Sequence, residues 1–68
     1  MYMEKHIKLT GKSTVSWKDA ILKTISEASK SINNISSIKI NEQFAKISEN
    51  KIIEYFVTID LTFQVNNS

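Results

Sequence analysis

The sequence predicts an α+β fold in which one helix covers one face of a three-stranded antiparallel sheet, in the order strand, helix, strand, strand. Residues 3–9 and 53–65 alternate apolar and polar side chains, as half-buried strands do. Residues 17–32 carry apolar side chains at helical spacing. The chain of 68 residues has no proline and one glycine. We therefore expect a single domain over 1–68 with structure almost from end to end.

The first strand is indicated by Met3, Lys5, Ile7 and Leu9, which occupy one side of a two-residue repeat. A loop is expected from Gly11 to Ser16. Ser16 is followed three residues later by Asp19, the spacing of a capping box that satisfies free N–H groups at a helix start. The helix should therefore begin at Trp17.

The helix has one apolar stripe, which should face the sheet. It consists of Trp17, Ile21, Ile25, Ala28 and Ile32. Trp17 could stack on a ligand, but its spacing with the isoleucines favours an apolar anchor. Asn33 and Asn34 tolerate the left-handed conformation common at helix ends, so the helix should stop there.

The second strand starts near Ile35, and its apolar residues change parity along its length. Ile38 and Ile40 share one parity, whereas Ala45 and Ile47 have the other. This change predicts a β-bulge between Asn41 and Phe44. The segment 48–51 should form a tight turn at Asn50, which joins the second and third strands as a hairpin.

The third strand is predicted to be long and two-faced. Its odd-numbered side chains, from Ile53 to Val65, are apolar, and its even-numbered side chains are mostly polar with Phe56 among them. If the first strand pairs beside the third, the helix covers the odd-numbered face and leaves the other face to water or another chain. A strand of about thirteen residues exceeds the usual length of five or six, so we expect it to serve a neighbouring subunit.

The composition favours self-association. A chain this short buries too little surface to be stable alone, and it has no cysteine for a disulfide or a typical structural zinc site. The lack of cysteine, of a leader and of an 18-residue apolar run predicts a cytoplasmic protein that does not span a membrane. Nine lysines, no arginine and a net charge of +2 are spread singly, so nucleic acid is not the expected partner.

No catalytic constellation is present. His6 is the only histidine, which excludes a cluster of histidine metal ligands and leaves no candidate Ser-His-Asp set. Glu54 and Asp60 share a strand face, but their wide separation favours solvation or pairing between subunits over acid–base work. We expect no enzymatic activity and no metal site.

Taken in order, several segments resemble the dodecin family. They are Leu9-Thr10-Gly11-Lys12-Ser13, Ser16-Trp17-Lys18-Asp19-Ala20, Ala28-Ser29-Lys30, Asn33-Asn34-Ile35, Glu42-Gln43, and Asn50 to Tyr55 with the strand ending at Phe63. The resemblance covers nearly the whole chain. It implies a flavin-binding or flavin-storing protein, with riboflavin, FMN or FAD as ligand, whose β-α-β-β protomers form a hollow homododecamer with helices outward.

The resemblance also identifies three candidate ligand-binding positions, at which this sequence departs from the family. Ser37 stands where flavin-binding members have a stacking tryptophan, Phe56 where they have a glutamine, and Phe44 where bacterial members often have an arginine. Phe56 could stack on the ring instead. Alternatively, Phe44 and Phe56 pack against other copies and close the pocket. The function is then either weak binding of a flavin or another small planar ligand, or a structural assembly with no flavin ligand.

Overall fold

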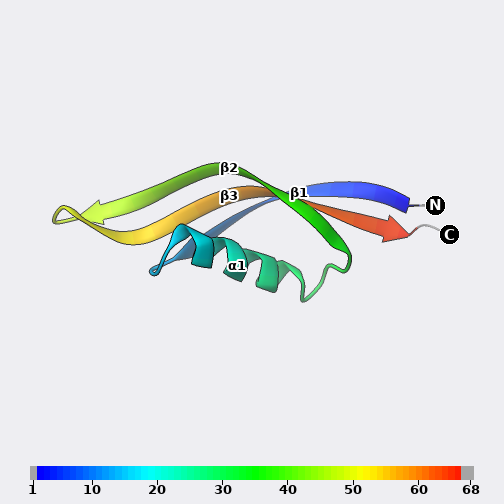
Figure 1. Cartoon of the computed structure of the whole chain (residues 1–68), viewed down its shortest axis with the longest axis horizontal. Coiled ribbons are helices and arrows are strands. Elements are labelled where there is room, and N and C mark those ends of the chain that lie inside the picture. Colours follow the sequence, from blue (N-terminus) through cyan, green and yellow to red (C-terminus); the bar gives the residue numbers. More distant parts are fainter. Residues whose placement is uncertain (1, 67–68) are drawn as a thin grey trace.

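The computed structural model describes residues 2–66 and contains the four predicted elements in the predicted order (Figure 1). They are strand β1 (Tyr2–Ser13), helix α1 (Trp17–Ala28), strand β2 (Ile35–Ser48) and strand β3 (Lys51–Asn66). The strands form one antiparallel sheet in the order β1-β3-β2. The α+β class and the pairing of the first strand with the third are confirmed. Residues 1, 67 and 68 of the predicted domain lie outside the described residues.

Strand β1 runs through Gly11 to Ser13, so the predicted loop from Gly11 to Ser16 is wrong in its first half. Gly11 pairs with Val57 in the sheet, and α1 lies directly against it. A Cβ atom at this position would overlap the hydroxyl of Thr24 and approach the backbone of Ala20. The glycine therefore marks the close approach of the helix to the strand and not a turn.

The helix begins at Trp17 as predicted. Ser16 has an extended backbone, and its side chain accepts a hydrogen bond of 2.9 Å from the backbone N–H of Asp19. The helix ends at Ala28, earlier than the predicted stop at Asn33 and Asn34. The chain continues in turns, in which the N–H of Ile32 still bonds to the carbonyl of Ala28 at 2.9 Å. Asn34 takes the expected left-handed conformation, with a φ of 63°.

The hairpin between β2 and β3 turns through Glu49 and Asn50, which have φ angles of 52° and 65°. Positive φ at both central residues is the requirement of a type I′ turn. The predicted bulge is present, because the register skips Asn41 between Ile40 and Glu42. The pairing also skips Ser36 on β2 and Ile53 on β3. These three irregularities fix which side chains of the two strands share a face.

The core lies between α1 and the odd-numbered face of β3, as predicted. Val57, Ile59 and Leu61 are fully buried there, together with Ala20 of the helix. Against Ala20, Val57 and Ile59 pack half-buried apolar side chains, which are Leu9, Trp17, Ile21 and Ile38. The buried line of the helix is Ala20 and Thr24, so the predicted stripe that starts at Trp17 flanks the contact and does not form its centre. Small side chains at the centre let the helix come close to Gly11.

In the part of the chain that the structure describes, no helix lies on the other face of the sheet (Figure 1). Because α1 packs on β1 and β3, parts of β2 are uncovered on the helix side as well. Ile40 pairs with buried Ile59 and is nevertheless 44% exposed. The hairpin extends past the helix start, which makes the molecule elongated, with extents of 55 × 20 × 12 Å (Figure 1). In the described part of the chain, no helix has the length and apolar character needed to cross a membrane.

Candidate functional site

The open face is the side of the sheet opposite α1. Strand pairing arranges its side chains in rows across the three strands, because paired residues of neighbouring strands point the same way. From the hairpin inward, these rows are Lys12-Phe56-Phe44, Thr10-Thr58-Glu42, Lys8-Asp60-Lys39 and His6-Thr62-Ser37. All three candidate positions from the sequence therefore lie on the open face.

Phe44 and Phe56 lie opposite each other on β2 and β3 and form an aromatic pair. Their ring centroids are 4.8 Å apart and their planes differ by 4°, so the rings stack. The Lys46 ammonium lies 5.6 Å from the centroid of the Phe56 ring, a cation–π distance. Phe44 is 46% exposed, whereas Phe56 is half-buried. The pair therefore offers an exposed aromatic surface at Phe44.

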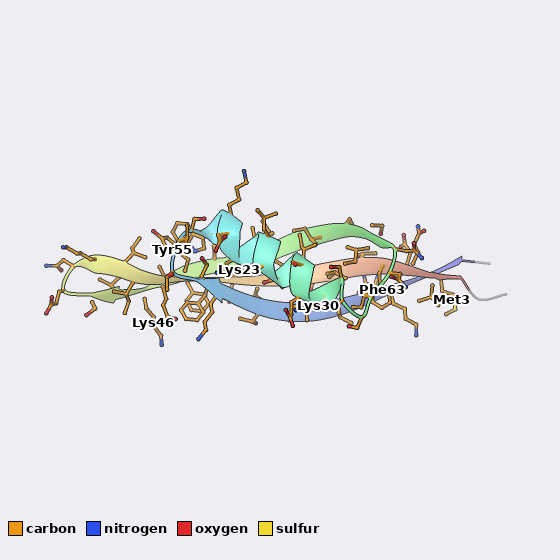
Figure 2. All side chains as sticks on the ribbon, turned by 90° about the horizontal axis from the view of Figure 1, so that it is seen from below. Met3, Lys23, Lys30, Lys46, Tyr55 and Phe63 are labelled. Atoms are coloured by element: carbon orange, nitrogen blue, oxygen red, sulfur yellow. The ribbon has the colours of Figure 1, made fainter. Side chains whose placement is uncertain are left out.

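The helix side supports the backbone of this pair. The Trp17 indole donates a hydrogen bond of 3.0 Å to the carbonyl oxygen of Phe44. The same ring meets Tyr55 edge to face, with centroids 4.9 Å apart. Figure 2 shows Tyr55 beside the start of the helix. Trp17 is therefore an anchor of the helix on β2 and β3, in agreement with the apolar-anchor interpretation, and it faces away from the open face.

Ser37 lies far from the aromatic pair. It is opposite Thr62, which is six residues along β3 from Phe56. At about 3.3 Å per residue, the two positions are roughly 20 Å apart. One planar ligand cannot contact both within a single protomer. A site that contains Ser37 and the phenylalanines together needs a second copy of the chain.

The charged groups of the open face are exposed or half-buried and only partly paired. Lys12 forms an ion pair with Glu54 at 3.8 Å. His6 Nδ1 lies 2.9 Å from the Thr62 hydroxyl, within hydrogen-bond distance. Between residues 2 and 66, no group of three or more His, Cys, Asp or Glu side chains is placed to hold a metal ion.

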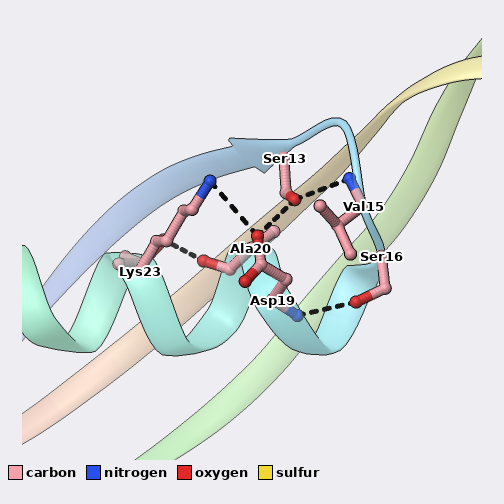
Figure 3. A network of polar contacts seen from close by, with 7 residues as sticks. Ser13, Val15, Ser16, Asp19, Ala20 and Lys23 are labelled. Carbon is pink, nitrogen blue, oxygen red and sulfur yellow. Dashed lines mark hydrogen bonds and ion pairs between the residues drawn. The ribbon is translucent and has the colours of Figure 1, made fainter.

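A polar network at the start of the helix is structural. The Asp19 carboxylate accepts a 2.5 Å hydrogen bond from the Ser13 hydroxyl and lies 3.2 Å from the Lys23 ammonium (Figure 3). The Ser13 hydrogen bond, followed by that from Lys23, lowers the pKa of Asp19 below its ordinary value. The Ser13 hydroxyl also accepts from the N–H of Val15 at 2.9 Å. The network ties the end of β1 to the first turn of α1.

A groove of about 480 Å³ lies between α1 and β1, on the helix side of the sheet. Apolar side chains that include Ile7, Leu9 and Ile32 line it, with Lys12, Lys23 and Glu27 also at its edge. None of the three candidate positions borders this groove. It is therefore a separate surface from the aromatic pair.

A dodecin family model matches residues 3–66, which is nearly the whole described chain. The chain belongs to the dodecin family. Dodecins bind flavins, form homo-oligomers and are not catalysts. Membership therefore implies a small-ligand binding protein.

Solved dodecins share the fold of this dodecin. An arginine-to-alanine mutant of the Thermus thermophilus dodecin matches with a TM-score of 0.92 and 22% identity, over 98% of this chain and 100% of that one. The Streptomyces davaonensis dodecin matches with a TM-score of 0.90 and 20% identity, over 97% of each chain. The Mycobacterium tuberculosis calcium dodecin, described as calcium chelating, matches with a TM-score of 0.82 and 24% identity, over 97% of this chain and 94% of that one. Comparison with curated proteins found no match.

Sequence reasoning missed the neighbours of the aromatic pair. Lys46 can reach the Phe56 ring because the register skips Ile53, which places Lys46 on the same face of the sheet as Phe56. Counting residues back from the turn without this skip would place Lys46 on the opposite face. The rows that join β1 to β3 could not be derived either, because a helix and not a hairpin connects these strands. The alternation of β3 was the one signal that placed Phe56 and Asp60 on a common face.

Proposed function

We propose that this dodecin is a non-catalytic, cytoplasmic homo-oligomer that binds or stores a planar small molecule of the flavin class, with riboflavin, FMN or FAD as candidates. Family membership supports the ligand class and self-association. The family also suggests twelve subunits in a hollow shell. The observation that carries the proposal is the stacked pair of exposed Phe44 and half-buried Phe56, on a sheet face that no element between residues 2 and 66 covers.

Uncovered apolar side chains support assembly. Strands β2 and β3 together expose the large apolar side chains of Ile40, Phe44, Ile47, Ile52 and Ile53. Strands β1 and β2 are both sheet edges, and each is more than ten residues long. Long apolar edges favour pairing with another chain, so assembly accounts for their presence. A chain of this size also gains stability from association.

The aromatic pair supports stacking on a planar ring. One face of Phe56 contacts Phe44 and Lys46 lies over the ring as well, so the accessible aromatic surface of the pair belongs to Phe44. The ring of Phe44 is held by its neighbour on β3 and by the Trp17 hydrogen bond to its backbone. A preorganised ring loses little freedom on binding, which favours affinity. Phe44, more than Phe56, is therefore the stacking residue of this proposal.

The second candidate function is a structural assembly without a flavin ligand. The observation that favours it is that Phe44 and Phe56 already stack on each other. In an assembly, this hydrocarbon could pack against another copy and fill the space that a ligand would take. The serine at position 37 agrees with this alternative, because its side chain has no aromatic ring that could stack on a flavin.

Flavin titration of the purified protein separates the two candidates. On binding, we expect riboflavin or FMN fluorescence to be quenched, and Phe44→Leu to weaken affinity about tenfold or more, since stacking contributes about 1 to 3 kcal/mol per ring. Phe63→Leu is the matched control, because Phe63 lies on the helix side of β3. Unchanged fluorescence into the micromolar range refutes flavin binding and leaves the structural alternative. A native mass equal to one protomer refutes assembly.

A further inference from the structure

The end of the β2–β3 hairpin, residues 47–53, is an apolar arm that stands apart from the rest of the protomer. Ile47 and Ile52 are paired across the two strands, and the register skips Ile53 beside them. All three side chains are exposed, Ile47 to 59%. The hairpin arm extends past the start of α1, so among the described residues no helix covers it (Figure 1). A cluster of three exposed isoleucines indicates a surface that another molecule covers.

The groove between α1 and β1 is an apolar hollow that can receive such side chains. Its volume is about 480 Å³, and the half-buried side chains of Ile7, Leu9 and Ile32 contribute to its lining. Strand β1 is an edge of the sheet, so the groove lies at the side of the molecule. Strand β3 is continuous from Lys51 to Asn66, so the hairpin arm cannot fold back into the groove of its own chain. An arm that fills this groove therefore comes from another copy.

The exposed area of the chain agrees with a missing neighbour. A monomeric protein of 7.8 kDa is expected to expose about 4,400 Å². This chain exposes 5042 Å². The excess of roughly 650 Å² approaches the ~800 Å² that each partner buries in a stable interface of standard size. The protomer therefore exposes about as much additional surface as one stable contact buries.

The charges beside the two apolar surfaces are complementary. Lys23 and Glu27 stand one helical turn apart where α1 borders the groove. At the hairpin turn, Glu49 and Lys51 are exposed, and neither forms an ion pair among the described residues. An arm in the groove can bring Glu49 to Lys23 and Lys51 to Glu27. Because exposed ion pairs contribute little energy, these pairs would set the orientation of the arm, and the isoleucines would supply the affinity.

We propose that the hairpin arm of one copy inserts Ile47 and Ile52 into the α1–β1 groove of the next copy. This inference rests on the self-association in the proposed function and names the two surfaces that meet. The contact joins two different surfaces, so each copy donates one arm and receives another. Such head-to-tail contacts close into a ring when the rotation between copies permits, which leaves no arm exposed. The groove is separate from Phe44, so this contact and flavin binding can be tested independently.

Cross-linking tests which surfaces meet, because the chain has no cysteine and engineered thiols are therefore unique. Lys51→Cys with Glu27→Cys places one thiol on the hairpin arm and one beside the groove, both at exposed positions. With a short bis-maleimide, we expect this variant to form covalent chains of three or more copies on denaturing gels. Lys51→Cys with Leu22→Cys is the matched control and should not form them, because Leu22 is exposed on α1 but does not line the groove. Circular dichroism checks that each variant is folded.

A second measurement needs no cross-link. Ile47→Ser with Ile52→Ser should raise the protein concentration at which the oligomer dissociates by about a hundredfold or more, as expected for loss of two buried isoleucines. Leu22→Ser, the control, should leave it unchanged. Dissociation that is unaffected by the isoleucine variant, or cross-linked chains that are equal in the control, would overturn this contact while self-association stands. A native mass of one protomer for the parent protein would overturn self-association and this contact together.

Discussion

Replacing Gly11 by alanine tests whether α1 sits on β1 as closely as the structure indicates. The new Cβ would overlap the Thr24 hydroxyl, which is buried and donates a 2.7 Å hydrogen bond to the Ala20 carbonyl. Gly11 has no positive φ, so its backbone would accept alanine. Without the overlap, the alanine would therefore raise the free energy of unfolding by about 0.4 to 1 kcal/mol, because it lowers the conformational entropy of the unfolded chain. Overpacking costs about 1 to 3 kcal/mol and acts in the opposite direction.

The net expectation is a loss of about 1 to 2 kcal/mol in the free energy of unfolding, because the overpacking cost exceeds the entropic gain. Thr24→Ala removes the overlapping hydroxyl, so the double variant should be more stable than the sum of the single effects. A coupling of about 1 kcal/mol or more is expected for residues in such contact. Urea denaturation followed by circular dichroism, at one fixed protein concentration, measures the parent and the three variants.

The reasoning fails if Gly11→Ala is as stable as the parent, or if the two substitutions are additive. Either result would mean that the helix does not press on this strand position. Val15→Ala serves as a background variant, because Val15 is 67% exposed in the loop before the helix. Its effect should stay within about 0.5 kcal/mol, as is usual for surface substitutions.

Two further predictions concern the core and the helix start. Ile59 is fully buried, so Ile59→Ala should lower the free energy of unfolding in urea by about 2 to 5 kcal/mol. Leu22→Ala is the control and should cost far less, because the Leu22 side chain is 55% exposed. Similar costs for the two variants would contradict the assignment of the buried face of β3. The lowered pKa of Asp19 means that its stabilising contribution is present above pH 3.8 and is lost as the pH falls through the folded-state pKa. The stability difference between the parent and Asp19→Asn should therefore shrink on acidification, and a difference independent of pH below 4 would contradict this.

Local signals predicted most element boundaries. Ser16 and Asp19 placed the helix start, since a capping side chain must lie three residues before the N–H that it binds. The parity change after Ile40 placed the bulge at Asn41, and Asn50 marked the hairpin turn. Each of these depends on interactions within a few residues, which a sequence shows directly.

The boundaries that failed depend on contacts between distant segments. Gly11 resembles a loop residue locally, but it extends β1 because Ala20 and Thr24 need a position without a side chain beneath them. The helix stripe was centred on Trp17 and Ile21, whereas the structure buries Ala20 and Thr24. Both errors have one cause, which is that the closest packing uses small residues that an apolar pattern does not emphasise.

By itself, the sequence determined the four elements, their order and the face of β3 that is buried. It also identified Ser37, Phe44 and Phe56 as the positions to examine. Only the tertiary structure decided that Phe44 and Phe56 stack while Ser37 lies roughly 20 Å away, and that Lys8 and Lys39 flank Asp60. The physical reason is register. The alternation of a strand sets the direction of its side chains, but hydrogen bonds between strands and their bulges decide which side chains meet.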